Sequence, residues 1–207
     1  MPKRVRTHVN PLGILKEHQF EGFGNDRDIM IDVGACKGEF VAGLAEQFPE
    51  RNFLVFEIRV PLANKLREKF KDRENIVVFD GDAGRNFKNI LMPCLEQEAV
   101  IKQIFINFPD PWFKEKHKKR RFLNAKFLES VHAYLDARTE FIFQTDQKFL
   151  FEETLEMLQE SGLVELSFFK EPPFGLRTDW ESAKIKEGSE IYRMKFTLRC
   201  PQSVSHE

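Results

Sequence analysis

The chain has 207 residues, of which 42% are hydrophobic and 31% charged, and its formal net charge is −1. This length and composition predict a globular protein of one domain with a sizeable core. The near-zero net charge excludes a basic field over the whole surface. The absence of any run of about 18 apolar residues predicts no membrane span, and the first residues lack the apolar stretch of a secretory signal.

The chain has three cysteines, Cys36, Cys94 and Cys200. Their spacing is unlike that of metal ligands, so we expect no metal. Their odd number argues against a disulfide framework. These features together are typical of a protein of the reducing cytoplasm.

Residues 1–28 are polar and basic, and they contain Pro11, Gly13, Gly22 and Gly24. We expect an irregular basic arm that either contacts a phosphate backbone through Lys3, Arg4, Arg6 and His8 or is disordered. We expect residues 29–207 to form a single domain.

Short apolar runs alternate with stretches of helical periodicity after the arm. The runs predict strands over residues 29–33, 53–56, 76–79, 101–108 and 141–143. Amphipathic helices are expected around residues 41–48, 62–70, 84–96, 127–135 and 151–158. Two late strands, 163–169 and 191–198, flank a long loop. The pattern predicts an α/β fold with a mostly parallel seven-stranded sheet, helices on both faces and an antiparallel edge.

Each of the first five predicted strands delivers a carboxylate near its carboxyl end. Taken singly, such acids are usually helix caps or solvated turn residues. Ligands of open α/β sheets, however, bind beyond the carboxyl ends of the strands. We therefore predict a ligand site built around Asp32, Glu57, Asp82, Asp110 and Asp146.

The turn after the first strand and the acid after the second predict a nucleoside cofactor. Glu57 lies about 20 residues past the turn, where a ribose is held by its two hydroxyls. The turn has Gly34 and Gly38, but Cys36 and Glu39 depart from the dinucleotide pattern. Because a pyrophosphate would be repelled by Glu39, S-adenosylmethionine is favoured over NAD, although an NAD-dependent oxidoreductase stays an alternative.

The segment from Phe108 to Arg121 combines an acid between two prolines, a tryptophan and a basic run. Residues 114–121 carry six Lys or Arg, one Glu and one His. The plain alternative is a solvated basic helix face, but the density of charge favours contact with a nucleic-acid backbone. Trp112 or Phe113 could stack on a splayed base, and Asp110 could accept hydrogen bonds from a guanine edge.

The same segment resembles that of the bacterial tRNA (guanine-N7)-methyltransferases, which form 7-methylguanosine in the variable loop of tRNA. The resemblance covers nearly all of the chain after the arm. It is carried by Phe108-Pro109-Asp110-Pro111-Trp112 with Lys114, His117, Lys119, Arg120 and Arg121, by Thr145-Asp146, and by Thr178-Asp179-Trp180-Glu181.

The resemblance implies a Rossmann-like class I methyltransferase fold, S-adenosylmethionine as cofactor and tRNA as partner of a monomer or homodimer. It implies a catalytic Asp110 and a cofactor site lined by Asp32, Glu57, Asp82 and Asp110, to which the glycine turn adds Gly34 and Gly38. The substrate would be bound by Lys114, Asp146, Thr178, Asp179, Trp180 and Glu181, with the basic residues Lys118, Lys119, Arg120 and Arg121 beside them.

Two positions depart from the family pattern, because Asp32 replaces a usual Glu and Cys36 a usual glycine. Two alternatives stay open besides the oxidoreductase, and the departures support the second of them. One is a methyltransferase that acts on another RNA or on a protein, and the other is a non-catalytic RNA-binding relic of the same fold.

Overall fold

The computed structural model describes residues 9–199 of the chain. Its centre is a seven-stranded sheet with the strand order β3-β2-β1-β4-β5-β7-β6. The first five strands are parallel, and β7 runs antiparallel to both β5 and β6. The bounds are β1 Ile29–Val33, β2 Asn52–Glu57, β3 Ile76–Asp80, β4 Ile101–Asn107, β5 Glu140–Thr145, β6 Val164–Phe168 and β7 Tyr192–Leu198. The predicted α/β fold with an antiparallel edge is confirmed.

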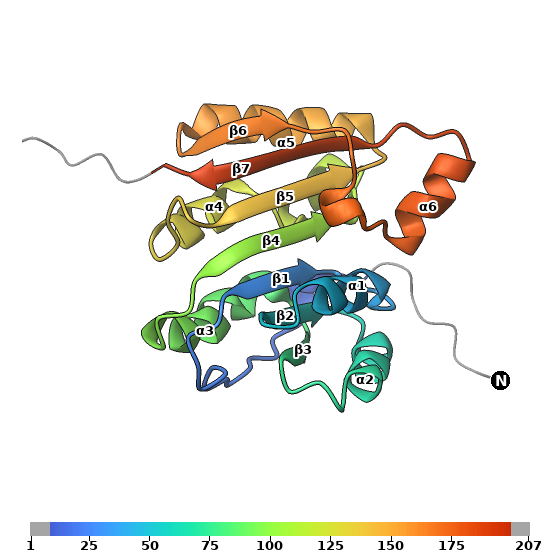
Figure 1. The fold of residues 1–207 in the computed structure, drawn as a ribbon. Helices are drawn as coiled ribbons and strands as arrows, with labels where there is room; N and C mark the ends of the chain where they lie inside the picture. Colours follow the sequence, from blue (N-terminus) through green and yellow to red (C-terminus); the bar gives the residue numbers. More distant parts are fainter. Residues whose placement is uncertain (1–8, 200–207) are drawn as a thin grey trace, which may run out of the picture.

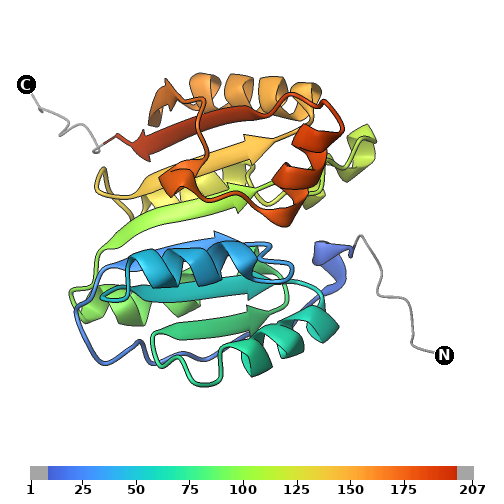
Figure 2. The same cartoon turned by 45° about the vertical axis from the view of Figure 1, so that its right-hand side comes forward.

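Helices cover both faces of the sheet (Figures 1 and 2). One face is covered by α1 (Glu39–Gln47) and α2 (Val60–Lys69). The other is covered by α3 (Ala83–Glu96), α4 (Ala125–His132) and α5 (Lys148–Ser161). No helix within residues 9–199 is both long and apolar enough to cross a membrane.

Phenylalanine fills much of the core on both faces. The largest fully buried side chains include Phe53, Phe87, Phe105, Phe141, Phe143 and Phe196. Phe141 stacks on Phe196 at a centroid distance of 4.7 Å, which joins parallel β5 to antiparallel β7. The apolar runs of the sequence are therefore buried strands.

The segment before β1 lies along the edge strand β3 (Figure 1). Lys16 donates to the carboxylate of Asp80 at 2.8 Å, and the backbone N–H of His18 donates to Asn86 in α3. Phe20 and Phe23 pack against the core. Lys3, Arg4, Arg6 and His8, which we predicted to contact phosphates, lie outside the described residues, as does Cys200.

The expected loop between the last two strands contains a helix, α6 (Asp179–Lys186), so this part of the prediction is wrong. Thr178 caps the helix, because its side chain accepts a hydrogen bond from the backbone N–H of Glu181 at 3.0 Å. A Thr-x-x-Glu sequence is a helix start that the sequence does contain, although here only the Thr178 half of the capping box forms, because the Glu181 side chain pairs with Arg193 instead. In Figure 1, α6 lies beyond the carboxyl ends of β4 and β5.

A buried chain of polar side chains holds α6 on the sheet. Glu181 is completely buried and accepts from Arg193 at 2.5 Å. Arg193 also donates to Gln144 at 3.0 Å, and Gln144 donates to Asn107 at 2.7 Å. This polar relay, Glu181–Arg193–Gln144–Asn107, connects α6 to the end of β4 through β7 and β5.

Removing Arg193 should destabilise the fold strongly. The change Arg193→Met leaves the Glu181 carboxylate buried without its main counter-charge, which costs about 3–5 kcal/mol. The free energy of unfolding in urea measures the effect. Arg138→Met, which breaks the exposed pair with Asp136, is the matched control and should cost less than about 1 kcal/mol. Adding Glu181→Gln to Arg193→Met should recover part of the loss, and equal losses for the single and double variants would contradict the ion-pair explanation.

Candidate functional site at the carboxyl edge of the sheet

The carboxyl ends of β1 to β5 meet at one edge because these strands are parallel. The strand order reverses between β1 and β4, which are neighbours although β2 and β3 separate them in the chain. A reversal of this kind opens a crevice in which α/β proteins bind ligands. Asp32 and Glu57 lie in the last two residues of β1 and β2, and Asp82, Asp110 and Asp146 follow β3, β4 and β5 at this edge.

The turn after β1 is built for close backbone packing. Gly34 and Gly38 have φ values of 87° and 73°, which side chains rarely adopt. The backbone N–H of Gly34 donates to Phe56 in β2 at 2.8 Å. A Cβ on Gly38 would lie 2.5 Å from the side chain of Leu66, so this glycine is required by packing of α1 against α2. Cys36 also has a positive φ, of 54°.

Glu57, the predicted ribose ligand, is buried and paired in this structure. One carboxylate oxygen accepts from the backbone N–H of Cys36 at 2.9 Å. Arg59 donates to both oxygens, at 2.8 Å and 2.9 Å. A ribose must therefore compete with the Arg59 guanidinium for this carboxylate. Arg59 was not predicted as a site residue, and its position two residues after Glu57 is the only signal for it in the sequence.

Asp32 is buried in β1 and lacks a hydrogen-bond partner among residues 9–199. Burial, helped by the negative charge of Glu57, raises the pKa of Asp32 to about 7. The chain thus keeps an acid in the crevice without compensating its charge. Such an acid at a cleft is typical of a binding or catalytic group.

Two acids follow β3, and they differ in their environments. Asp82 caps α3 by accepting from the backbone N–H of Gly84 at 3.0 Å, and burial raises the pKa of Asp82. Asp80 was not predicted as a site residue. Burial alone would raise the pKa of Asp80, but hydrogen bonds from Lys16 and Arg67 outweigh it and lower the pKa. The Asp80 carboxylate is thus already paired with two cations of the fold.

The Asp110 segment has an unusual backbone. Phe108 and Trp112, on either side of the Pro-Asp-Pro sequence, have φ values of 50° and 45°. Non-glycine residues in this region carry strain, which is found most often at ligand sites. The backbone N–H of Phe108 donates to the carbonyl of Gln144 at 2.8 Å, which fixes the start of the segment to β5. Asp110 itself is partly buried.

The basic run forms a 3-10 helix, Glu115–Arg120, and its charges have different surroundings. Lys118 and Arg121 pair with Glu153 in α5 at 3.1 Å and 2.6 Å. Arg120 lies over the Trp112 ring, with its guanidinium carbon 4.9 Å from the ring centroid. Arg121 is largely buried and holds the segment to α5, so its predicted contact with RNA stays a prediction.

Three lysines of the run, Lys114, Lys116 and Lys119, are exposed. None of them forms an ion pair with a residue that the structure describes. They are therefore the members of the run whose charge is available to a polyanion.

The first turn of α6 joins the two halves of the edge. Asp179 pairs with Lys37 of the glycine turn at 3.0 Å. The indole N–H of Trp180 donates to Asp146, which follows β5, at 3.3 Å. The structure thus brings the predicted residues Asp146 and 178–181 together, although they are more than 30 positions apart in the sequence. Glu181 points into the core as part of the polar relay.

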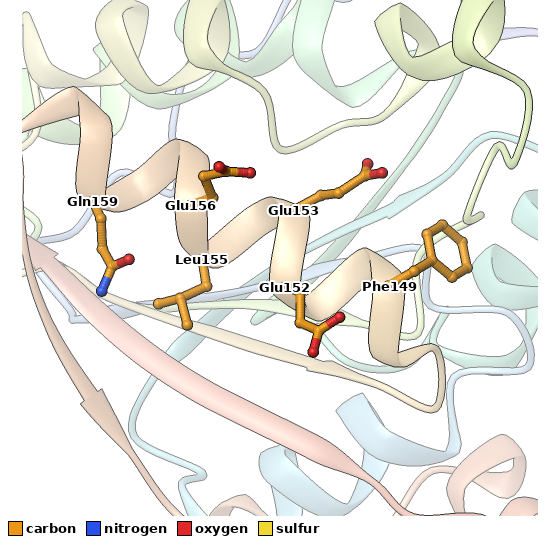
Figure 3. Close-up of a pocket in the computed structure, with 6 residues that line it drawn as sticks. All are labelled: Phe149, Glu152, Glu153, Leu155, Glu156 and Gln159. Atoms are coloured by element: carbon orange, nitrogen blue, oxygen red, sulfur yellow. The ribbon is translucent and has the colours of Figure 1, made fainter.

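A shallow hollow of about 500 Å³ follows α5 (Figure 3), and its Glu153 is the residue that pairs with Lys118 and Arg121 of the basic run. Figure 3 shows Glu153 and Glu156 on one side of the helix, and Leu155 and Glu152 on the other. Three glutamates in its lining make the hollow unsuitable for a polyanion. Within residues 9–199, no group of three or more His, Cys, Asp or Glu side chains is placed to hold a metal ion.

The raised pKa of Asp32 predicts a pH dependence of stability. The folded state keeps the proton on Asp32 up to about pH 7, whereas the unfolded chain releases it near pH 4. Asp32 therefore costs nothing below about pH 4, and its cost grows to about 4 kcal/mol as the pH rises to about 7. Asp32→Asn should remove this loss.

Urea unfolding across this pH range measures the difference between Asp32→Asn and the unmodified chain. The stability advantage of the variant should grow from about pH 4 to about pH 7 and then level off. The exposed Asp72→Asn is the control and should follow the unmodified chain. An advantage that does not change with pH would contradict the raised pKa.

The fold is shared with methyltransferases of known structure. The crystal structure of the 16S rRNA methyltransferase KamB superposes with a TM-score of 0.55 at 15% identity, over 84% of this chain and 88% of that chain. Similarity at this level of identity establishes the fold alone.

Sequence comparison identifies the family. A family model described as "Putative methyltransferase" matches residues 26–194. The tRNA (guanine-N(7)-)-methyltransferase of Exiguobacterium sp. (strain ATCC BAA-1283 / AT1b) is 34% identical over 192 residues, 89% of this chain and 86% of the relative. The enzyme of the same name from Bacillus velezensis is 33% identical over 184 residues, 86% and 82% of the two chains. The chain therefore belongs to the tRNA (guanine-N7)-methyltransferase family.

Proposed function

We propose that this chain transfers a methyl group from S-adenosylmethionine to N7 of a guanine in the variable loop of tRNA. The observation that carries the proposal is the position of Asp110. It lies at the sheet reversal, in a segment held between two strained residues, and the exposed lysines of the basic run follow it directly. Membership of the family supports the same reaction.

The crevice fits a nucleoside cofactor without phosphates. Gly34 has open space where a side chain would stand, since no atom lies within 4 Å of a Cβ built there. Asp32 offers an unpaired carboxylate, and Glu57 and Asp82 lie on the two following loops. Glu39 in the first turn of α1 disfavours a pyrophosphate at that helix end. When bound, S-adenosylmethionine supplies a methyl group on a positively charged sulfur.

The reaction at guanine needs no general base, because N7 has an in-plane lone pair and no proton. The demand on the protein is alignment, which can lower a barrier by about 7–11 kcal/mol in favourable cases. Positive charge moves onto the purine as N7 gains the methyl group. We assign Asp110 the role of orienting the guanine and stabilising that charge, without removing a proton.

The RNA is proposed to lie over the β4–β5 half of the edge. Lys114, Lys116 and Lys119 would contact phosphates, and Trp180 offers an indole that is 53% exposed for stacking. Asp146, which accepts from the Trp180 indole N–H, and Asp179 would contact the RNA beside it. We infer from the proposed tRNA substrate that the chain acts in the cytoplasm, as a monomer or homodimer.

Transfer of labelled methyl groups from S-adenosylmethionine to tRNA transcripts tests the activity. Transcripts with the variable-loop guanine should be labelled, and matched transcripts with adenine at that position should not. Labelling of both to the same extent would contradict the proposed target, and labelling of neither would contradict the activity.

Asp110→Asn should lower the single-turnover rate by about 100-fold, the usual cost of removing one electrostatic contact to a transition state. The variant keeps the shape of the side chain and removes its charge. Asp136→Asn at the opposite edge of the sheet is the control and should retain the full rate. A full rate in Asp110→Asn would exclude the assigned role.

Replacing Lys114, Lys116 and Lys119 by alanine should weaken tRNA binding and flatten its salt dependence. Each lost phosphate contact lowers the slope of log K against log salt by about 0.7–0.9. Filter binding across a salt series measures this slope. The exposed lysines Lys65, Lys71 and Lys88 provide a control with the same change in net charge, and their replacement should leave the slope unchanged. An equal effect of both triple variants would remove the run from the interface.

A further inference from the structure

Two buried polar groups on neighbouring strands lack hydrogen-bond partners within the described residues 9–199. One is the carboxylate of Asp32 in β1, which is 3% exposed. The other is the side-chain nitrogen of Asn107 at the end of β4, a buried donor that contacts no acceptor. Folded proteins rarely leave such groups unpaired, and a ligand that pairs them is a common reason.

Strand register places these two groups on one face of the sheet. Asp32 is opposite Phe105, and Asn107 follows Phe105 by two residues in β4, so all three side chains lie on the same side. Phe105 packs in the core beneath α1. The carboxylate and the amide therefore flank the crevice between β1 and β4, one from each strand.

The polar relay determines which end of the Asn107 amide is free. An arginine can only donate, so the Gln144 oxygen must face Arg193 and the Gln144 nitrogen must face Asn107. Asn107 accepts that bond through its own oxygen, which leaves its nitrogen as the unpaired atom. Glu181 in turn holds Arg193. The orientation of the Asn107 amide is thus fixed by the Glu181–Arg193 ion pair at the other end of the polar relay.

A buried acceptor on one strand and a buried donor further along the neighbouring strand, on the same face, are complementary to an α-amino acid, which carries an ammonium and a carboxylate on one carbon. We propose that Asn107 donates to the α-carboxylate of the methionine part of S-adenosylmethionine, while Asp32 receives the α-ammonium. This inference rests on the proposed function. It assigns a binding role to Asn107 and a positioning role to Gln144 and Arg193.

Calorimetric titration with three nucleosides tests the assignment. S-adenosylhomocysteine has both charged groups, its decarboxylated analogue retains only the ammonium, and 5′-methylthioadenosine has neither. Asn107→Ala should weaken binding of S-adenosylhomocysteine by roughly 10- to 100-fold, the effect of one charge-assisted hydrogen bond, and leave the other two affinities unchanged. Asp32→Asn should weaken the first two ligands and spare the third.

Gln144→Glu provides a nearly isosteric second variant. Glutamate still accepts from Arg193 but cannot donate, so Asn107 must turn its nitrogen toward residue 144 and present its oxygen to the ligand. The variant should therefore bind S-adenosylhomocysteine more weakly and leave the affinities for the other two ligands unchanged, as expected for Asn107→Ala. Thermal unfolding of each variant checks that the fold is intact.

Three results would overturn the assignment. Equal weakening of all three ligands by Asn107→Ala would show a structural role. Unchanged binding of S-adenosylhomocysteine by both Asn107→Ala and Gln144→Glu would show no role. If the unmodified chain binds all three ligands equally, the zwitterion site is absent while the cofactor class stands. Failure of the unmodified chain to bind any of them would instead overturn the proposed function itself.

Discussion

The direct pairing of β1 with β4 is the constraint on which the site depends. The chain leaves β1 toward α1 on one face of the sheet and leaves β4 toward α4 on the other. The two loops diverge, and the crevice between them cannot be filled by either. The glycine turn borders it on the β1 side and the Asp110 segment on the β4 side. The other residues of the site lie around this opening.

The acids at this edge of the sheet differ in their ion pairs and hydrogen bonds. Asp80 is neutralised by cations of the N-terminal segment and α2, and Glu57 is held by Arg59. Asp82 belongs to a helix cap. Asp32 is buried, and it has no hydrogen-bond or ion-pair partner among residues 9–199. Uncompensated negative charge is therefore concentrated next to the crevice, where a cationic ligand would neutralise it.

Much of this arrangement was accessible from the sequence. Apolar runs and helical periodicity predicted the seven strands and the first five helices, because buried strands and amphipathic helices have different repeats. The carboxylates could be placed at one edge because parallel strands share a direction. The Asp110 segment was recognised from its composition and from its resemblance to a family.

The remaining features depend on contacts between distant residues. The polar relay could not be inferred from local pattern, because Glu181 and Asn107 are far apart in the chain. Arg193 stands in a strand that also contains Lys195 and Thr197, so its local sequence neither marks it as buried nor names its partners. The helix α6 was missed although its Thr-x-x-Glu start was visible, since the surrounding prolines and glycine favoured a loop.

The N-terminal segment from Ile14 to Phe23 covers one edge of the sheet and so hinders pairing of that edge with another chain. An edge strand presents unpaired backbone groups that can pair with another chain. Here His18 contacts the carbonyl oxygen of Asp80 at the end of β3, and Phe20 packs edge-on against Phe79. The segment thus caps the β3 edge, whereas the β6 edge carries an exposed Phe168. A shortened chain that began at β1 would have two open edges, and strand addition between copies would compete with folding of the monomer.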